Sequence, residues 1–337
     1  MLSERQELVL KLIVDEYVKT AEPIGSRSLS KFMDVSPATI RNEMSDLEDL
    51  GYLEKTHTSS GRIPSEKGYR YYIETILKNL DEETDGFFEF ETIFENKENE
   101  RDEIIKEAIN LLSQATNCTA ISLGPNAFHS KVKKVSLIPL KDTQALILVI
   151  TNFGYVESKH ITISEDTEME ELVKVIELLN ELLIDTPISK VSEKLHYEIQ
   201  HHKIKELLKY RETIVDSFIE AFSKFAQTKY YLTGQSNMLY QPEFNDIQKL
   251  REFITTIENN EIFKIIETNG DGVSVKIGTE NQVTSMQDCT VVSSTYHTKE
   301  GEKGTISVVG PTRMEYRKVI PLMKFIAKHI SKLYEEE

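Results

Sequence analysis

The order of the elements expected in the first 80 residues constrains this chain more than any other feature. The segment SPATIRNEMSDLEDLGYL predicts a helix that is capped by Ser36, begins at Pro37 and ends before Gly51. Two helical patterns precede it: a long one that opens at Ser3 with a capping box, and a short one that Ser26 caps. Three helices are therefore expected before Gly51.

A hairpin is expected directly after these helices. Residues 52–55 alternate as a strand does, THTSSGR at 56–62 is a tip of small and flexible residues, and residues 63–65 return as a second strand. A fourth helix is expected over 66–77. Three helices followed by a hairpin is the order of a winged helix-turn-helix, so residues 1–80 are predicted to form such a DNA-binding domain.

The third helix has two different faces. Its apolar face, expected to pack on the first helix, consists of Ile40, Met44, Leu47 and Leu50. The buried stripe predicted for the first helix consists of Leu8, Leu12 and Ile13. The opposite face of the third helix carries short or planar hydrogen-bonding side chains, namely Ala38, Thr39, Arg41, Asn42 and Ser45, with Ser36 at its start. Such side chains suit the major groove, where Arg pairs with guanine, Asn with adenine, and methyl groups with thymine. An ordinary exposed face of a three-helix core is the alternative.

The formal net charge of −16 requires any DNA-binding surface of this chain to hold its positive charge locally. The hairpin and the start of the fourth helix interrupt the acidic trend, with Lys55, His57, Arg62, Lys67 and Arg70. Hydroxyl and backbone N–H groups that could add phosphate contacts lie at Thr58, Ser59, Ser60 and Gly61. We therefore predict that Arg41 and Asn42 read bases, while Arg62 and Lys67 mainly hold phosphates.

The rest of the chain predicts a connector and an interrupted α+β domain. Residues 81–103 are dense in acid, but their phenylalanines predict a partly helical connector that docks on a neighbour. Strands are expected over residues 119–123, 133–140, 145–151, 155–161, 273–278, 289–296 and 304–309. Residues 187–260 between the two sets of strands look mostly helical. One α+β domain, interrupted by a helical insertion, explains this order.

The insertion is also the predicted dimer contact. Its large aromatic side chains, more than one short helix usually buries within itself, are Phe218, Phe222, Phe225, Tyr230 and Tyr231. One winged helix reads too few base pairs to select a single operator, so a homodimer is expected. Internal packing of these aromatic side chains is the alternative.

Residues 22–74, EPIGSRSLSKFMDVSPATIRNEMSDLEDLGYLEKTHTSSGRIPSEKGYRYYIE, strongly resemble the N-terminus of the heat-inducible transcription repressor family HrcA. The chain also resembles this family in VSVKIGTEN at 273–281, in GTISVVGPTRMEY at 304–316 and in LTGQSNMLYQPEFND at 232–246. The resemblance covers nearly the whole chain and is weakest at 81–103 and around 187–225. Thr56 is a small departure, because many members are expected to have proline there.

The resemblance implies an α+β fold in which a winged helix-turn-helix precedes a GAF-like domain with a dimerising insertion. The limits expected for these parts are 1–80 for the DNA-binding domain, 81–103 for the acidic connector, 104–186 and 261–337 for the GAF-like domain, and 187–260 for the insertion. It further implies a dimeric repressor that binds an inverted-repeat operator upstream of chaperone operons, with activity supported by the chaperonin. A winged-helix regulator whose GAF-like domain senses a small-molecule effector is the alternative.

Other motifs in the chain predict no chemistry. His196, His201 and His202 lack the spacing and partners of a metal shell, and no acid, base and nucleophile share a motif, so we expect no enzyme, metal or cofactor. Arg313, after a Gly-Pro turn, could cap the closing helix, hold a carboxylate or join two domains. The two cysteines, Cys118 and Cys289, fit a reduced compartment better than a disulfide framework. With no apolar run long enough to span a bilayer, a cytoplasmic protein is expected.

Overall fold

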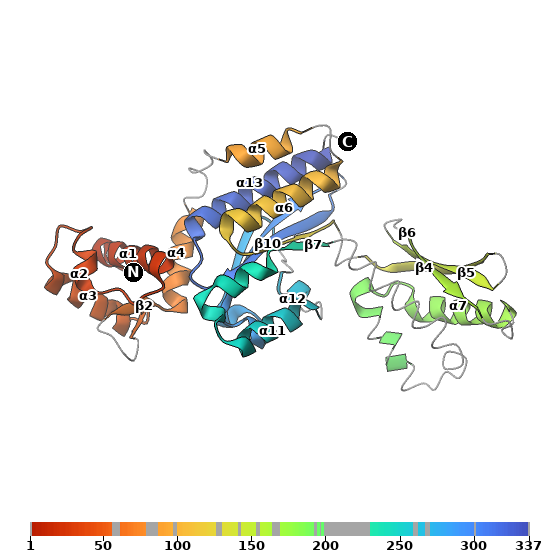
Figure 1. Cartoon of the computed structure of the whole chain (residues 1–337), viewed down its shortest axis with the longest axis horizontal. Coiled ribbons are helices and arrows are strands. Elements are labelled where there is room, and N and C mark those ends of the chain that lie inside the picture. The colour runs from red at the N-terminus through yellow and green to blue at the C-terminus, as the bar shows by residue number, and fades with distance from the viewer. Residues whose placement is uncertain are drawn as a thin grey trace. The chain divides into compact units, whose positions relative to one another are not determined.

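The chain forms two compact units, Met1–Ser122 with Leu232–Glu337, and Leu123–Tyr231 (Figure 1). The computed structural model describes residues 2–55, 61–78, 87–96, 100–125, 130–140, 143–152, 156–163, 169–191, 194–195, 197–198, 230–258, 262–266, 270–299 and 301–335. The first unit holds the two-stranded and the five-stranded sheet, the second holds the three-stranded sheet, and each has its own buried core. They are therefore described separately.

The first unit begins with a winged helix-turn-helix, as predicted. Its elements are α1 (Glu4–Thr20), α2 (Ser26–Leu29), α3 (Pro37–Asp49), β1 (Leu53–Lys55), β2 (Arg62–Pro64) and α4 (Glu66–Lys78). The capping box at Ser3 is present, and the Ser36 side chain accepts a hydrogen bond from the backbone N–H of Thr39. The predicted cap of the short helix is wrong, because Gly25 is the N-cap of α2 and Ser26 is its first residue. For α1 and α3, the local signals located the helix starts to the residue.

The buried face of α1 differs from the predicted stripe. The residues that it buries are Val9, Leu10, Ile13 and Val14. Leu8 is 41% exposed, and Leu12 is only half-buried. The reason is that α1 packs against α3, β2 and α4 together, so its buried face is set by three neighbours rather than by α3 alone. Leu50 is 48% exposed because α3 ends at Asp49 and Leu50 is its C-cap.

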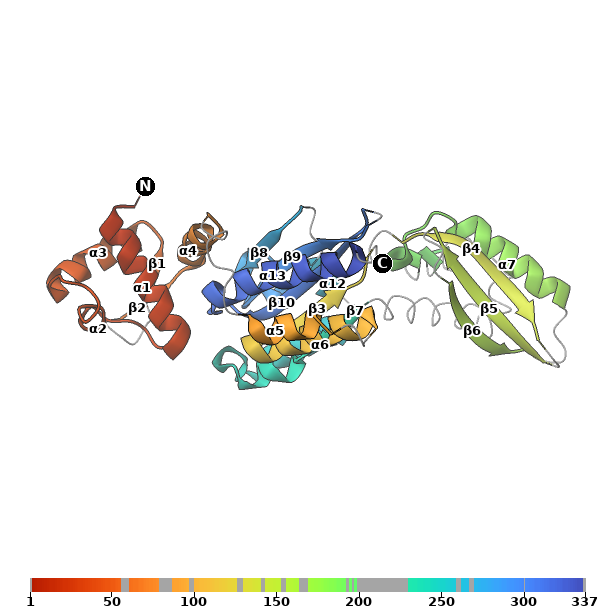
Figure 2. The same ribbon diagram turned by 90° about the horizontal axis from the view of Figure 1, so that it is seen from above.

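A GAF-like domain completes the first unit. Its elements are α5 (Phe88–Phe94), α6 (Arg101–Thr116), β3 (Thr119–Leu123), β7 (Tyr230–Thr233), η4 (Gln235–Tyr240), η5 (Pro242–Phe244), α11 (Ile247–Glu258), α12 (Ile262–Ile266), β8 (Val273–Ile277), η6 (Gly278–Glu280), η7 (Thr284–Met286), β9 (Cys289–His297), β10 (Lys303–Pro311) and α13 (Tyr316–Glu335). The five strands are ordered β7-β3-β10-β9-β8. The long helices α6 and α13 lie along one side of this sheet, with α5 beside them (Figures 1 and 2).

Burial on both faces explains why β9 and β10 lack a clean alternation of apolar and polar residues. Every residue of β9 except His297 is buried, and so is every residue of β10 except Lys303. A strand covered on both faces has no solvent side on which to place polar residues. The buried hydroxyls pair with one another instead, as Ser293 and Ser307 do at 2.8 Å.

The acidic connector docks through its aromatic side chains, as predicted. The rings of Phe87 and Phe94 pack on Phe325 of α13, and Phe94 also stacks on His329. Phe90 is buried between the helices, whereas Phe88 is exposed. Apolar burial therefore holds α5 in place within a segment whose charge would otherwise favour solvent.

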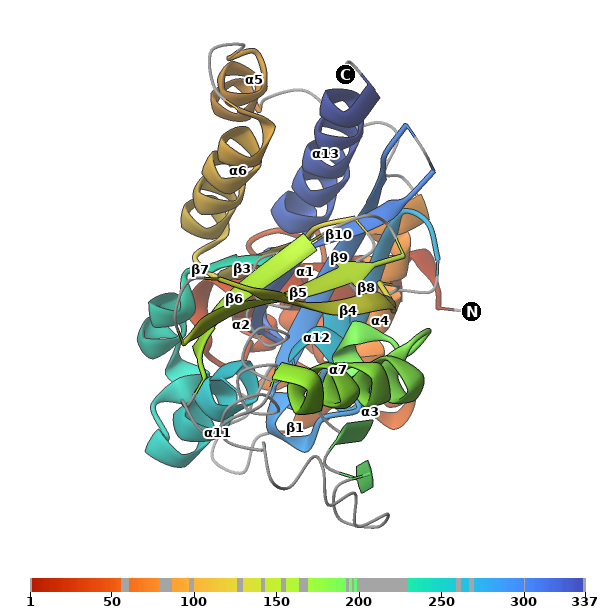
Figure 3. The same cartoon turned by 90° about the vertical axis from the view of Figure 1, so that its right-hand side faces the viewer.

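The second unit has a three-stranded antiparallel sheet covered by one helix (Figure 3). Its elements are β4 (Val132–Pro139), β5 (Gln144–Thr151), β6 (Val156–Thr162), α7 (Met169–Leu183) and η2 (Ile188–Lys190). The strands are ordered β4-β5-β6, and α7 packs on β4. The Asn180 side chain ties helix to strand, since it accepts from the Val135 N–H and donates to the Val135 carbonyl, each at 2.8 Å.

The domain limits differ from those predicted. The sequence predicts residues 104–186 to belong to the GAF-like domain, but β4, β5, β6 and α7, which lie within this range, form the core of the second unit. The insertion therefore spans 123–231 rather than 187–260, and residues 232–260 return to the first unit. The alternation of a strand identifies the strand but not the sheet that it joins, so the sequence pattern could not separate the two sheets.

Candidate nucleic-acid interface

The predicted reading face of α3 is accessible. The exposed side chains on it are Ser36, Ala38, Arg41, Asn42 and Ser45, and Thr39 is half-exposed. Two of these residues also hold the helix end: the Ser36 Oγ accepts from the Thr39 N–H at 3.1 Å and lies 3.0 Å from the Thr39 Oγ1. Arg41, Asn42 and Ser45 therefore remain as the polar side chains that can reach a base edge without unmaking the cap.

Three arginines line a cleft beside this face. The cleft has a volume of about 590 Å³, and its lining residues are Gly25, Ser26, Arg27, Arg41, Met44 and Arg62. Arg27 lies in α2, and the sequence analysis did not predict it as a DNA-contacting residue. Among the described residues, neither Arg27 nor Arg41 has an ion-pair partner. The Arg27 guanidinium suits a phosphate oxygen, and the Arg41 guanidinium, on the exposed face of α3, suits a base edge.

The cations of the wing are already paired. The Lys55 ammonium lies 2.9 Å from one carboxylate oxygen of Glu48, and the Arg62 Nε lies 2.7 Å from the other. Burial alone would raise the pKa of the Glu48 carboxyl, but the hydrogen bonds from Lys55 and Arg62 hold that pKa below its ordinary value. The pairing links both wing strands to the last turn of α3.

The tip of the wing carried four of the predicted phosphate contacts. His57, Thr58, Ser59 and Ser60 lie outside the described residues. Gly61 is described and is buried against Pro23: an added Cβ would lie 2.8 Å from Pro23 backbone atoms. Close packing, rather than exposure to a ligand, therefore explains a glycine there.

Lys67 supports the C-terminal end of α3. Its ammonium donates to the Leu50 carbonyl at 2.7 Å and lies 4.4 Å from the centre of the Tyr52 ring. The neighbouring Ser65 hydroxyl donates to the Gly51 carbonyl at 2.7 Å. A cation at the C-terminal end of α3 also opposes the negative end of the helix dipole. Lys67 is exposed, so this contact leaves its other donors accessible.

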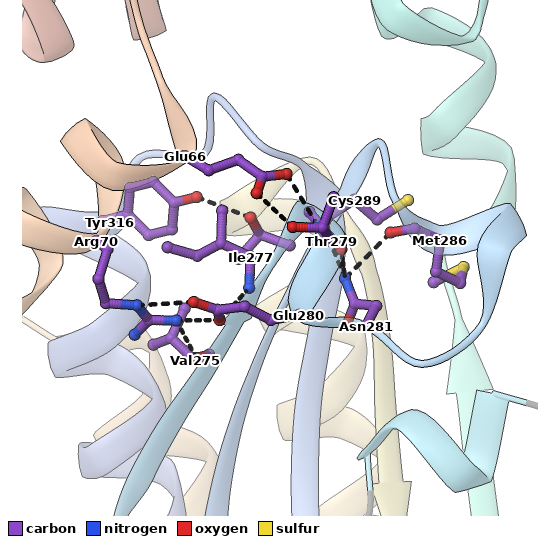
Figure 4. A network of polar contacts seen from close by, with 12 residues as sticks. Glu66, Arg70, Val275, Ile277, Thr279, Glu280, Asn281, Met286, Cys289 and Tyr316 are labelled. Carbon is purple, nitrogen blue, oxygen red and sulfur yellow. Dashed lines mark hydrogen bonds and ion pairs between the residues drawn. The ribbon is translucent and has the colours of Figure 1, made fainter. Parts of the chain in front are cut away.

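The Arg70 side chain points toward Glu280 and the Val275 carbonyl (Figure 4). Its guanidinium donates to Glu280, with Nε 3.1 Å from one carboxylate oxygen, and to the Val275 carbonyl at 2.8 Å. One turn earlier on α4, the Glu66 carboxylate accepts from the Thr279 N–H at 2.9 Å and from the Thr279 hydroxyl. The structure thus places Arg70 in a contact between α4 and the GAF-like domain. The sequence could not show this, because both partners lie more than 200 positions away.

Arg313 combines two of the roles left open by the sequence. It holds the Glu243 carboxylate, with Nε 2.6 Å from one oxygen, and donates to Gln241 at 3.0 Å. It also donates to the Val18 carbonyl, in the last turn of α1, at 3.2 Å. It is therefore both a carboxylate holder and a domain contact.

Comparison with known proteins identifies the family. The model described as "Winged helix-turn-helix transcription repressor, HrcA DNA-binding" matches residues 1–75, and "HrcA protein C terminal domain" matches residues 102–320. The chain belongs to the HrcA family. Two curated relatives, each a heat-inducible transcription repressor HrcA from Acholeplasma laidlawii, one of them strain PG-8A, are 40% identical over 100% of this chain and 98% of the relative.

A solved structure supports the same fold. The crystal structure of a hypothetical protein matches with a TM-score of 0.64 at 26% identity, over 100% of this chain and 99% of that one. The resemblance to HrcA seen in the sequence is thereby confirmed over the whole length, including the winged helix and the mixed C-terminal domain.

The remaining candidates in this HrcA-family chain have structural roles or lie outside the described residues. His196, His201 and His202 lie outside them, and the described part holds no group of three or more potential metal ligands. Both cysteines are unpaired and buried, and burial raises the pKa of the Cys118 thiol to about 12. Within the described ranges, no helix is both long and apolar enough to cross a bilayer.

Proposed function

We propose that this HrcA-family chain represses heat-shock chaperone operons by binding an inverted-repeat operator in the cytoplasm as a homodimer. The observation that carries the proposal is the exposed polar face of α3 beside the arginine-lined cleft. This surface places local positive charge on a chain of net charge −16. Its side chains are those that discriminate bases in the major groove.

The proposed interface divides the work between two kinds of contact. Arg41 and Asn42 read base edges, because they are exposed at the centre of the α3 face. Arg27 holds a backbone phosphate from the other side of the cleft. The wing contributes two further cations to the interface, Lys55 and Arg62, which Glu48 holds in place through its two carboxylate oxygens. Arg70 takes no part.

Arg41→Ala tests the reading face. Its removal is expected to weaken operator binding by about 1–3 kcal/mol, roughly fivefold to 150-fold, because a bidentate base contact is lost. Arg27→Ala should weaken operator and random DNA alike and lower the salt slope by about one unit. Arg70→Gln should leave that slope unchanged, because the Arg70 guanidinium is already paired with the Glu280 carboxylate. Fluorescence anisotropy over a salt series measures all three; equal losses on operator and random DNA for Arg41→Ala would contradict the assignment.

The proposed dimer follows from the geometry of the operator. An inverted repeat presents two half-sites related by a two-fold axis, and each calls for one α3. The insertion is the proposed contact. Tyr230 and Tyr231 lie half-buried in β7, whereas Phe218, Phe222 and Phe225 lie outside the described residues.

The proposed support by the chaperonin rests on the topology of the first unit. β3 and β7 are neighbours in one sheet although the whole inserted unit separates them in sequence. Pairing such distant strands is slow and exposes strand edges on the way. Protein refolded from denaturant should therefore gain operator-binding activity when chaperonin and ATP are added. An unfolded competitor should erase that gain; full activity after unassisted refolding would refute this part of the proposal.

A further inference from the structure

Glu48 is an acidic residue on the surface proposed to face DNA. It lies in the last turn of α3 and continues, at helical spacing, the stripe of Ala38, Arg41 and Ser45. A carboxylate that faces a row of phosphates would be repelled by them. Its position therefore needs a reason beyond chance exposure, and its side chain is indeed only 21% exposed.

The contacts of Glu48 supply that reason. Each of its two oxygens holds a different wing cation, Lys55 at 2.9 Å and Arg62 at 2.7 Å. Lys55 and Arg62 are also directly opposite each other in the β1–β2 ladder. Like charges in opposite positions of a hairpin destabilise it, and a shared carboxylate removes that repulsion. The Arg62 side chain is 14% exposed and the Lys55 side chain 62% exposed, so the bridge fixes one cation firmly and the other loosely.

The two oxygens of Glu48 are thus both occupied. A carboxylate can read cytosine by accepting from its amino group, but both oxygens of Glu48 are directed at the wing cations and its side chain is only 21% exposed. The arrangement favours a role in placing the wing cations over a role in reading a base.

We infer that Glu48 is a specificity-determining residue of the DNA surface, an inference that rests on the proposed function. It reduces the net charge of the trio from +2 to +1, which lowers attraction for any phosphate backbone. It also fixes the wing cations relative to α3, so that they meet phosphates only where α3 is correctly seated. Binding to random DNA is therefore weakened, because the general attraction to phosphates is smaller. Binding to the operator keeps the contacts between the positioned wing cations and the phosphates.

Glu48→Gln tests the inference, with Asp49→Asn as the matched control. Both substitutions remove one negative charge from the end of α3, but Asp49 is exposed and forms no ion pair with any described residue. Glu48→Gln should strengthen binding to random DNA by about threefold to tenfold and steepen its salt slope by about one unit. Its preference for operator over random DNA should fall by a similar factor. Asp49→Asn should leave the salt slope unchanged.

A second variant separates charge from bridging. Glu48→Asp keeps the charge but is one methylene shorter, so it cannot hold both cations, and it should show part of the same loss of preference. All three variants should give the circular dichroism of the parent, because Gln and Asn keep the shape of the side chains that they replace and Asp keeps the charge. Equal effects of Glu48→Gln and Asp49→Asn would overturn the inference, as would a loss of operator binding with no gain on random DNA. If the parent itself showed no preference for the operator, the proposed function would fail instead.

Discussion

Removal of the inserted unit is expected to leave a folded monomer that no longer holds operator DNA. The deletion replaces residues 124–229 with a short turn that joins β3 directly to β7. These strands are neighbours in the sheet, so the GAF-like domain should close without the insertion. Loss of the dimer makes the second half-site a separate binding event, and operator affinity should fall by at least about a hundredfold.

A deletion with different limits serves as a control for this experiment. A deletion of residues 187–260, the limits expected from sequence, would remove η4, η5 and α11 from the first unit, together with the buried Phe244 and Phe253. That variant should fail to fold. Light scattering gives the oligomeric state of each, and anisotropy gives its affinity for DNA. If the variant that lacks residues 124–229 stayed dimeric, the proposal that the insertion forms the dimer contact would be wrong.

Gly68→Ala is expected to destabilise the winged domain by about 2–3 kcal/mol. Alanine in a helix normally gains about 1 kcal/mol over glycine. Here a Cβ on Gly68 would overlap the carbonyl oxygen of Tyr52 and lie 3.4 Å from the Leu10 side chain. The Tyr52 carbonyl also accepts the Ser65 N–H at 3.1 Å, a bond that joins the wing to α4. The clash and the strained bond outweigh the gain in helix propensity.

A thermal melt followed by circular dichroism should show a Tm lower by about 10 °C for Gly68→Ala. Gly270→Ala is the matched control, because nothing lies within 4 Å of a Cβ built there. That variant should melt like the parent protein. If Gly68→Ala were as stable as Gly270→Ala, α4 would have to be free to shift away from Tyr52.

The parts that the sequence predicted well are those fixed by local chemistry. Ser36, Pro37 and Gly51 mark a helix start and stop through their own backbone preferences, and α3 begins and ends where they place it. Strands β3 and β9 likewise lie where strands were predicted over residues 119–123 and 289–296. Such signals depend on neighbours a few residues away, so no tertiary information was needed.

The parts that it missed depend on distant partners. Lys55, Arg62 and Arg70 all counted as available cations, yet each is held by a carboxylate, and in Arg70 that carboxylate lies 210 positions along the chain. Arg27 was overlooked because its importance comes from the cleft it shares with Arg41, not from its own helix. The cleft beside α3 does not bear on an effector in the GAF-like domain, which stays a prediction.

Neighbouring residues at the start of α4 form hydrogen bonds with two different parts of the chain, the end of α3 and the GAF-like domain. Ser65 and Lys67 hold the carbonyls at the end of the recognition helix, while Glu66 and Arg70 hold the loop after β8. In the proposed complex with DNA, the contacts of Glu66 and Arg70 with the GAF-like domain would set the angle at which α3 enters the groove. Under the proposed function, the winged domain would set the base preference, and the whole chain, through its dimer contact, would set the distance between half-sites. A winged domain transplanted onto another dimerising partner would keep its half-site and lose its spacing.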